Sequence, residues 1–144
     1  MDETAFAKKV SEFSRLIGYD PIGDEPDYKN FFSAHAIDIP YIILSKDPEV
    51  SPEDTAKGIS ELWKGESVAL FIPGRKFDTF GTRKGRGGGW YDRFLSKVPR
   101  EWFRIGVLSE TQLSDEKLER KSWDEPMDVL LVWESGTWRI ISVF

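Results

Sequence analysis

Residues 73–95 have the sequence PGRKFDTFGTRKGRGGGWYDRFL, in which glycines and basic residues alternate before aromatic and aliphatic residues take over. They follow a continuous apolar run, VALFIP at 68–73, which has the length and composition of a buried strand in a parallel sheet. The stretch therefore predicts a strand, a glycine-rich loop, and a helix over 90–98 that ends before Pro99. Ligands of α/β sheets bind at the carboxyl ends of strands, and this loop begins at such an end.

The composition of the loop indicates an anion as its ligand. The segment 73–95 has six basic and two acidic side chains, a net +4, whereas the whole chain has a net charge of −5, so the remainder carries −9. Glycines let backbone N–H groups converge on a ligand, and a following helix would add its free N–H groups and positive dipole end. The glycines concerned are Gly81, Gly85, Gly87, Gly88 and Gly89.

The common phosphate-binding motifs do not match the loop. The chain has no Gly-Lys-Ser/Thr run of the Walker A type, and Trp90 stands where the third glycine of the dinucleotide fingerprint would lie. An RGG-like fragment that contacts RNA has a similar composition and stays open as an interpretation. The net charge of −5 disfavours nucleic acid as a partner.

Length and composition bound the class of protein. At 144 residues, with 40% hydrophobic residues, the chain predicts a single folded domain over 1–144. There is no cysteine, which excludes disulfides and thiolate metal sites. No apolar run approaches the length of a membrane span, and the start MDETAFAKKVSEF is unlike a signal peptide. We expect a soluble cytoplasmic protein with no membrane partner, either a monomer or a small homo-oligomer.

The remaining pattern predicts an α/β fold with a mostly parallel sheet flanked by helices and a C-terminal antiparallel hairpin. Apolar residues at helical spacing predict a helix over 3–17 that Gly18 ends. A second helix begins after Ser51, with Ala56, Ile59, Leu62 and Trp63 as its buried face. The other predicted elements are a loop over 18–34 with one helical turn at 28–32, an edge strand or extended segment over 37–44, strands over 103–108 and 127–133, a short helix over 115–121, and a hairpin that pairs 129–133 with 138–143.

The loop resembles the pattern P-G-x-x-F-D-x-x-G-x-R-L-G-x-G-x-G-Y-Y-D-R-x-L of the 5-formyltetrahydrofolate cyclo-ligase family, also called methenyltetrahydrofolate synthetases. The matching positions are Pro73-Gly74, Phe77-Asp78, Gly81, Arg83, Gly85, Gly87, Gly89, Tyr91-Asp92-Arg93 and Leu95. Gly106 and Gln112-Leu113 resemble a second family segment, and the run from Trp123 to Asp128 resembles the closing one. The resemblance covers residues 66–134, and it implies a NagB/RpiA/CoA-transferase-like arrangement of the α/β fold.

This resemblance implies an ATP- and Mg²⁺-dependent ligase of one-carbon metabolism, which converts 5-formyltetrahydrofolate to 5,10-methenyltetrahydrofolate. Phosphorylation of the formyl oxygen makes it a leaving group, after which the folate N10 closes the ring. Catalysis then depends on holding the γ-phosphoryl group beside that oxygen and stabilising its charge. A non-catalytic or repurposed relative, which binds a nucleotide or another phosphorylated ligand through the same loop, is the alternative.

The resemblance also assigns the site residues. Arg83 and Arg86 correspond to catalytic, phosphate-binding positions, because arginine suits bidentate contact with phosphate. Asp92 and Asp124 correspond to the Mg²⁺ ligands. The expected nucleotide-binding run is Arg83, Lys84, Gly85, Arg86, Gly87, Gly88, Gly89, Trp90 and Tyr91.

Each assignment has a plainer alternative. Asp92 could pair with Arg86 or Arg93, and Asp124 could be a turn former ahead of a proline. Trp90 and Tyr91 could be core residues of the helix start as readily as stacking surfaces for a ligand. The lone histidine, His35, and Asp78 are expected to be structural.

The chain departs from the family in its first half. Family members carry a longer N-terminal half, so residues 1–50 form a divergent portion. A family glutamate that contacts the pterin has two candidates here, Glu49 and Glu53. Lys84 stands in the place of a leucine, and Trp90 and Trp123 in the places of a tyrosine and a histidine.

Overall fold

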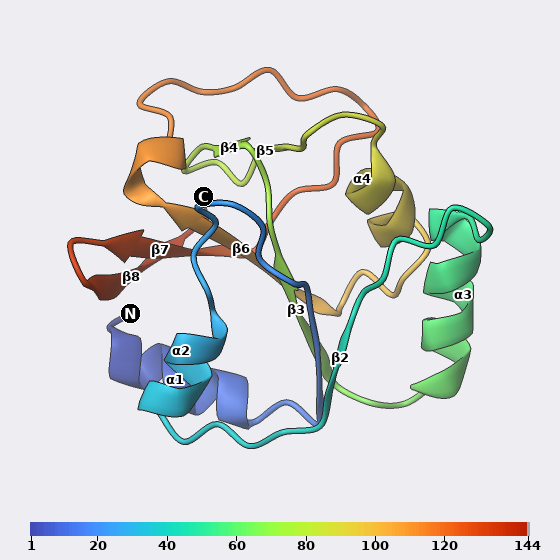
Figure 1. Ribbon diagram of the computed structural model, residues 1–144, viewed down its shortest axis with the longest axis horizontal. Helices are drawn as coiled ribbons and strands as arrows, with labels where there is room; N and C mark the ends of the chain where they lie inside the picture. Colours follow the sequence, from blue (N-terminus) through green and yellow to red (C-terminus); the bar gives the residue numbers. More distant parts are fainter. Residues whose placement is uncertain (144) are drawn as a thin grey trace.

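A six-stranded sheet crosses the middle of the molecule and carries helices on both faces (Figure 1). The computed structural model describes residues 1–143. The strands lie in the order β2-β1-β3-β6-β7-β8, and only β7 and β8 are antiparallel neighbours. Their bounds are Arg15–Gly18 (β1), Tyr41–Ile43 (β2), Val68–Ile72 (β3), Phe103–Ser109 (β6), Val129–Glu134 (β7) and Thr137–Ser142 (β8). The α/β fold with a mostly parallel sheet and a C-terminal hairpin is therefore confirmed.

The sheet divides the core into two layers, and a pair of helices covers each of them. The helices are α1 (Glu3–Ser11), α2 (Lys29–Ala34), α3 (Pro52–Leu62), α4 (Trp90–Leu95) and the 3₁₀ helix η1 (Glu110–Gln112). α1 and α2 pack on one face of the sheet, and α3 and α4 pack on the other. All five residues of β3 are buried, because this central strand is covered on both faces.

The segment 3–17 is not one helix. α1 ends at Ser11, and Arg15–Gly18 form β1 between β2 and β3. Leu16 and Ile17 are both buried, and they contribute to opposite faces of the sheet, as successive residues of a strand do. Ile17 continues the helical spacing of the apolar residues on α1, but strand pairing is what buries it.

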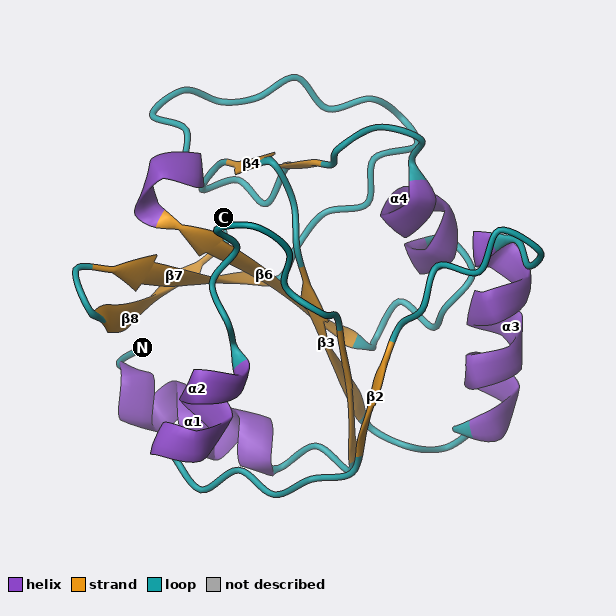
Figure 2. Cartoon of the chain, viewed as in Figure 1, coloured by secondary structure: helices purple, strands orange, loops and turns teal. Residues whose placement is uncertain are grey.

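The predicted helix over 115–121 is also wrong. Between η1 and β7 the described chain has no helix (Figure 2). The Leu118 N–H donates to Asp78 Oδ2 at 2.7 Å, and Arg120 Nη2 donates to the Phe80 carbonyl at 2.8 Å. These tertiary hydrogen bonds hold the segment against β4 (Lys76–Phe77) and β5 (Arg83–Lys84), a two-stranded hairpin that the sequence pattern did not indicate.

Other predictions hold with changed boundaries. Ser51 caps α3, since its Oγ accepts the Asp54 N–H at 3.0 Å. Leu62 is 73% exposed, so the predicted buried face of α3 is wrong at that position. α4 has six residues and ends at Leu95, before the predicted boundary. None of the helices over 1–143 is long and apolar enough to cross a bilayer.

The connections place a crevice between β1 and β3. From β1 the chain passes over one face through α2 to β2, and from β2 it passes over the other face through α3 to β3. The order of the strands therefore reverses between β1 and β3. Open α/β sheets bind ligands at such a reversal, outside the carboxyl ends of the strands.

Candidate active site

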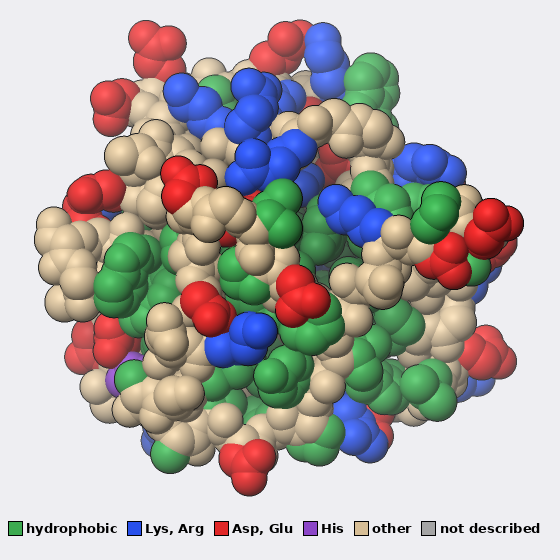
Figure 3. Space-filling view, in the orientation of Figure 1, with side chains coloured by type: hydrophobic (Ala, Val, Ile, Leu, Met, Phe, Trp, Pro, Cys, Tyr) green, Lys and Arg blue, Asp and Glu red, His purple; other side chains and the backbone are tan. Residues whose placement is uncertain are grey.

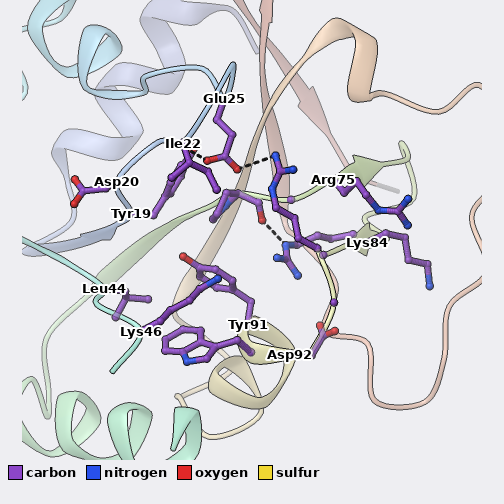
Figure 4. A pocket seen from close by; sticks show the side chains of 18 of the residues that line it. Tyr19, Asp20, Ile22, Glu25, Leu44, Lys46, Arg75, Lys84, Tyr91 and Asp92 are labelled. Carbon is purple, nitrogen blue, oxygen red and sulfur yellow. Dashed lines mark hydrogen bonds and ion pairs between the residues drawn. The ribbon is translucent and has the colours of Figure 1, made fainter. Parts of the chain in front are cut away.

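A cavity of about 510 Å³ opens at this reversal. Tyr19 follows β1, Leu44 follows β2, and Pro73 follows β3, so the carboxyl ends of three parallel strands contribute to it. The glycine-rich loop and the first residues of α4 form much of the rest. The lining residues are Tyr19, Asp20, Ile22, Glu25, Leu44, Lys46, Pro73, Gly74, Arg75, Arg83, Lys84, Gly85, Arg86, Gly87, Gly89, Trp90, Tyr91, Asp92 and Trp123 (Figure 4).

The glycine loop borders the cavity with its backbone. Gly85, Gly87 and Gly89 line the cavity, whereas Gly88 does not. Gly87 has φ 107°, a conformation that residues with a Cβ rarely adopt, and nothing lies within 4 Å of where its Cβ would be. Within residues 1–143, no backbone N–H from Gly85 to Gly89 donates a hydrogen bond. These donors are therefore available to an anion.

Two parts of the predicted cradle differ from expectation. Gly81 lies outside the cavity, and a Cβ there would approach the Met127 carbonyl to 2.8 Å, so it serves the packing of the loop. α4 has only six residues, so its dipole is weaker than that of the longer helix predicted over 90–98. The site therefore depends on side-chain charge and loop N–H groups.

Arg83 is the most deeply buried cation of the site, with 6% of its surface exposed. Its Nε donates to the Pro73 carbonyl, and its guanidinium lies 4.9 Å from the centre of the Tyr91 ring. Burial lowers the pKa of Arg83, and the charge of Asp92 is the largest effect that opposes this shift. An arginine stays charged under these conditions, so Arg83 presents a poorly hydrated positive charge to the cavity.

Lys84 and Arg86 each bind a carboxylate. Lys84 Nζ lies 3.0 Å from Asp124 Oδ2. Arg86 Nη2 lies 3.2 Å from Glu25 Oε2, and the Glu25 side chain is only 5% exposed (Figure 4). Lys and Arg side chains gather on the molecular surface where β4 and β5 lie (Figure 3). The cavity thus opens on a cationic surface whose charges are partly compensated by its own walls.

Asp92 and Asp124 lie together. Burial raises the pKa of Asp92, although the Glu125 N–H and Arg83 partly offset this effect. Burial acts in the same direction on Asp124, but hydrogen bonds from the Lys121 N–H and Lys84 outweigh it, and the pKa of Asp124 is lowered. Each carboxyl influences the pKa of the other.

This pair suits a cation that a second ligand helps to hold. Among residues 1–143 there is no cluster of three or more Asp, Glu, His or Cys side chains that would hold a metal ion alone. Mg²⁺ with nucleotide phosphates typically takes one or two protein carboxylates and completes its shell with phosphate oxygens and water. The half-buried Asp92, whose charge is poorly stabilised by the protein, fits that requirement.

Trp90 and Tyr91 both pack against the core and line the cavity. Tyr91 is buried in the core and also lines the cavity. Trp90 is partly buried and contacts Tyr91 edge to face, with ring centres 5.1 Å apart. Lys46 Nζ lies above both rings, 5.8 Å from the centre of the Trp90 ring and 5.2 Å from the centre of the Tyr91 ring.

The first half of the chain contributes residues that the sequence did not indicate. Tyr19, Glu25 and Lys46 line the cavity, but no motif surrounds them, and only their position after β1 and β2 distinguishes them. The two glutamates suggested by the family pattern lie elsewhere: Glu53 pairs with Arg93 at 2.8 Å, and Glu49 is exposed and outside the cavity.

Two predictions concern structural residues, and a third residue, Gln112, also has a structural role. The Asp78 carboxylate accepts N–H groups from Phe80, Thr82 and Leu118, as expected for a loop residue. His35 pairs with Glu3 at 2.7 Å, away from the cavity. The side chain of Gln112 donates to the Gly74 carbonyl at 2.7 Å, which fixes the start of the glycine loop to the chain after β6.

A model of the 5-formyltetrahydrofolate cyclo-ligase family matches residues 50–133, more than half of the chain. The chain belongs to this family. The match includes α3, the glycine loop, α4 and most of β7, so the resemblance over 66–134 is confirmed and extends further toward the N-terminus. Arg83, Arg86, Asp92 and Asp124 all lie within it.

Solved structures of the cyclo-ligase family share the fold. A 5,10-methenyltetrahydrofolate synthetase from Mycoplasma pneumoniae is similar with a TM-score of 0.58 and 22% identity, over 88% of this chain and 77% of that chain. The 5,10-methenyltetrahydrofolate synthetase of Aquifex aeolicus is similar with a TM-score of 0.59 and 23% identity, over 96% of this chain and 82% of that chain. The comparison with curated proteins gave no significant match.

Proposed function

We propose that this member of the family is an ATP- and Mg²⁺-dependent cyclo-ligase that converts 5-formyltetrahydrofolate to 5,10-methenyltetrahydrofolate. One observation carries the proposal: a single cavity at the carboxyl ends of β1, β2 and β3 contains the Gly/Arg loop and lies beside both predicted metal carboxylates. We further propose that it works in the cytoplasm as a single-domain monomer or small homo-oligomer, without nucleic acid or membrane.

The proposed phosphate groups bind to the loop. Arg83 would contact them from the cavity floor, where its low exposure strengthens the interaction with an anion. Arg86 would contact them from the exposed side, and the free N–H groups between Gly85 and Gly89 would complete the cradle. The two arginines stabilise charge as the γ-phosphoryl group moves to the formyl oxygen.

Asp92 and Asp124 would hold Mg²⁺ against the same phosphates. When bound, the metal neutralises charge on the transferred phosphoryl group. Lys84 forms an ion pair with Asp124 in the free protein. When Mg²⁺ binds Asp124, the Lys84 ammonium would move to a phosphate oxygen. The raised pKa of Asp92 is compatible with this role, because a bound cation would stabilise the ionised carboxylate.

Enzyme assay tests the proposal directly. Purified protein with 5-formyltetrahydrofolate should form the methenyl product, followed by its near-ultraviolet absorbance, only when ATP and Mg²⁺ are both present. Arg86→Met should lower kcat/KM by roughly a hundredfold, since a charged phosphate contact is lost. Lys97→Met, which removes an exposed cation outside the cavity, is the control and should stay active. No ATP-dependent product from the wild type would refute the proposal.

The alternative is a relative that binds nucleotide without this turnover. Trp123, in the place of the family histidine, is 65% exposed at the edge of the cavity, so the closing segment differs at the site itself. Calorimetry separates the two functions. Binding of ATP-Mg²⁺ without heat or product from added 5-formyltetrahydrofolate would favour the non-catalytic relative.

A further inference from the structure

Glu25 is an anionic side chain inside a cavity that we assign to anions. Its Oε2 pairs with Arg86 at 3.2 Å, and its Oε1 accepts the Ile22 N–H at 2.8 Å. The side chain is only 5% exposed, so the carboxylate depends on these partners for its stabilisation. Figure 4 shows Glu25 reaching from the segment after β1 to an arginine of the loop.

The ion pair and phosphate binding exclude each other. A phosphate on Arg86 would lie within a few ångströms of the Glu25 carboxylate, and two anions at that distance repel strongly in a site of low exposure. No atom packs against the side of Gly87, Gly88 or Gly89 where a Cβ would lie, so no packing contact there opposes a rearrangement of the loop. A phosphate ligand would therefore separate Arg86 from Glu25.

Tyr19 provides an unsatisfied polar group at the same wall. Tyr19 is 3% exposed and lines the cavity, yet its hydroxyl has no hydrogen-bond partner within residues 1–143. Burial raises the pKa of this hydroxyl, and the charge of Glu25 adds to the effect, so the group remains a proton donor. A buried hydroxyl without a partner is unfavourable, and a ligand can supply that partner.

We infer that Glu25 and Tyr19 determine specificity in a second subsite, which Arg86 keeps closed until a phosphate ligand takes that arginine and frees the Glu25 carboxylate. The inference rests on the proposed function and assigns the residues that recognise the ring of the substrate in the same cavity. The freed carboxylate accepts N–H groups, and the Tyr19 hydroxyl donates to a carbonyl.

The remaining walls suit a planar ring. Trp90 and Tyr91 offer aromatic surfaces, and Ile22 and Leu44 are apolar lining residues. A planar heterocycle that carries N–H donors next to a ring carbonyl satisfies both polar groups at once. The 2-amino-4-oxo edge of a reduced pterin has this pattern, so the subsite fits the ring of the proposed folate substrate.

The exchange couples the two ligands. Because nucleotide frees Glu25 for the ring, nucleotide should strengthen the binding of the ring, and the ring should strengthen the binding of nucleotide by the same factor. The Arg86–Glu25 ion pair then couples the two subsites, because a ligand in either subsite favours its separation.

Calorimetry on four proteins tests the inference: wild type, Glu25→Gln, Tyr19→Phe and the control Asp24→Asn. Asp24 is exposed and lies outside the cavity. A non-hydrolysable ATP analogue with Mg²⁺ is titrated alone, and 5-formyltetrahydrofolate is titrated with and without the analogue. Glu25→Gln keeps an acceptor for the Ile22 N–H and removes the charge, so the analogue should bind several-fold more tightly. Folate affinity with analogue should fall roughly tenfold in Glu25→Gln and in Tyr19→Phe, and cooperativity should be lost in Glu25→Gln.

Either of two results would overturn this inference without refuting the proposed function. One is that Glu25→Gln binds the analogue no more tightly than Asp24→Asn does, and the other is that both ligands bind the wild type independently. If the wild type turns over folate while either result holds, the proposed function survives. If the wild type binds neither ligand, both fail. Tyr19→Phe removes no hydrogen bond of the hydroxyl within the described chain, so it keeps the test valid if Glu25→Gln does not fold.

Discussion

The ionised Asp92 carboxylate is unfavourable in the free protein, and we propose that it binds Mg²⁺ in the complex with nucleotide. Its carboxylate is half-buried and accepts the Glu125 N–H at 3.0 Å, but burial still raises its pKa. A carboxyl whose pKa is raised on folding contributes stability at low pH, and that contribution is lost as pH rises through the folded-state pKa. At neutral pH the ionised Asp92 therefore destabilises the protein when no cation is bound.

Substitution Asp92→Asn should separate stability from function. The amide oxygen can still accept the Glu125 N–H, and the unfavourable charge is gone, so the free energy of unfolding at neutral pH should rise by no more than about 1 kcal/mol. Activity that depends on Mg²⁺ should fall at least about a hundredfold. Denaturant unfolding and a magnesium titration of activity measure the two effects. A variant that loses stability and keeps its magnesium response would contradict the assigned role.

Arg83 should tolerate no exchange for lysine, because its site uses the shape of the guanidinium as well as the charge. Arg83→Lys loses the bond from Nε to the Pro73 carbonyl and the contact with Tyr91. We expect ATP-Mg²⁺ affinity to fall at least about tenfold and stability to fall by about 1–2 kcal/mol. Arg139 is exposed on the edge strand β8, so Arg139→Lys is the matched control and should change neither quantity in calorimetry and thermal unfolding.

At the scale of single elements, helix α3 and the segment before β7 are stabilised by different means. α3 has a local start signal in Ser51 and Pro52, and its buried residue Ala56 packs on the sheet. The segment between η1 and β7 lacks helical hydrogen bonds, and side chains such as Asp78 and Arg120 hold its backbone.

Gly58→Ala should stabilise α3. Gly58 lies inside the helix on its exposed side, and a Cβ there would meet nothing within 4 Å. Alanine has the higher helix propensity and reduces the freedom of the unfolded chain, so the free energy of unfolding should rise by about 0.5–1 kcal/mol. Urea unfolding measures this gain, and ATP-Mg²⁺ affinity should stay unchanged because Gly58 is outside the cavity. A loss of stability would mean that α3 does not form as described.

Asp78→Ala should release the segment before β7. The substitution leaves three N–H groups without their acceptor, including that of Leu118, and the carboxylate is almost fully buried. We expect a loss of about 2–4 kcal/mol, together with new proteolytic cleavage between η1 and β7. Limited proteolysis with mass spectrometry locates the cleavage. Cleavage elsewhere first would argue against this anchoring.

At the scale of the whole molecule, the site depends on how the sheet brings distant segments together. Tyr19, Leu44 and Pro73 are far apart in the sequence, but each follows a neighbouring parallel strand. Tyr28 reinforces the N-terminal wall, because its hydroxyl donates to the Tyr19 carbonyl and accepts the Tyr19 N–H, both at 2.8 Å. A ligand in the cavity therefore contacts both halves of the chain at once.

Such a ligand should stabilise the entire fold. Binding to the native state alone adds about 2.7 kcal/mol when free ATP-Mg²⁺ is a hundredfold above its Kd. This corresponds to a rise in Tm of several degrees for a domain of this length. Differential scanning fluorimetry with ATP-Mg²⁺, against magnesium alone, measures the shift. Equal shifts for wild type and Arg83→Lys would argue that the ligand binds outside the cavity.

The sequence by itself determined the elements whose signals are local. The apolar run of β3, the cap of α3 and the turn between β7 and β8 each depend on neighbouring residues, and each lies close to its predicted place. Arg83, Arg86, Asp92 and Asp124 were recognisable because they belong to one family pattern, and their predicted roles remain proposals.

Only the tertiary structure decided the rest. Ile17 fits a helix by its spacing, but β1 forms because β2 and β3 offer hydrogen-bonding partners on either side. The segment at 115–121 has helical composition, but Asp78 takes one of the N–H groups that a helix would use. Glu25 and Tyr19 carry no motif and enter the cavity only through the strand order. Such features come from contacts between residues distant in sequence, which local periodicity does not encode.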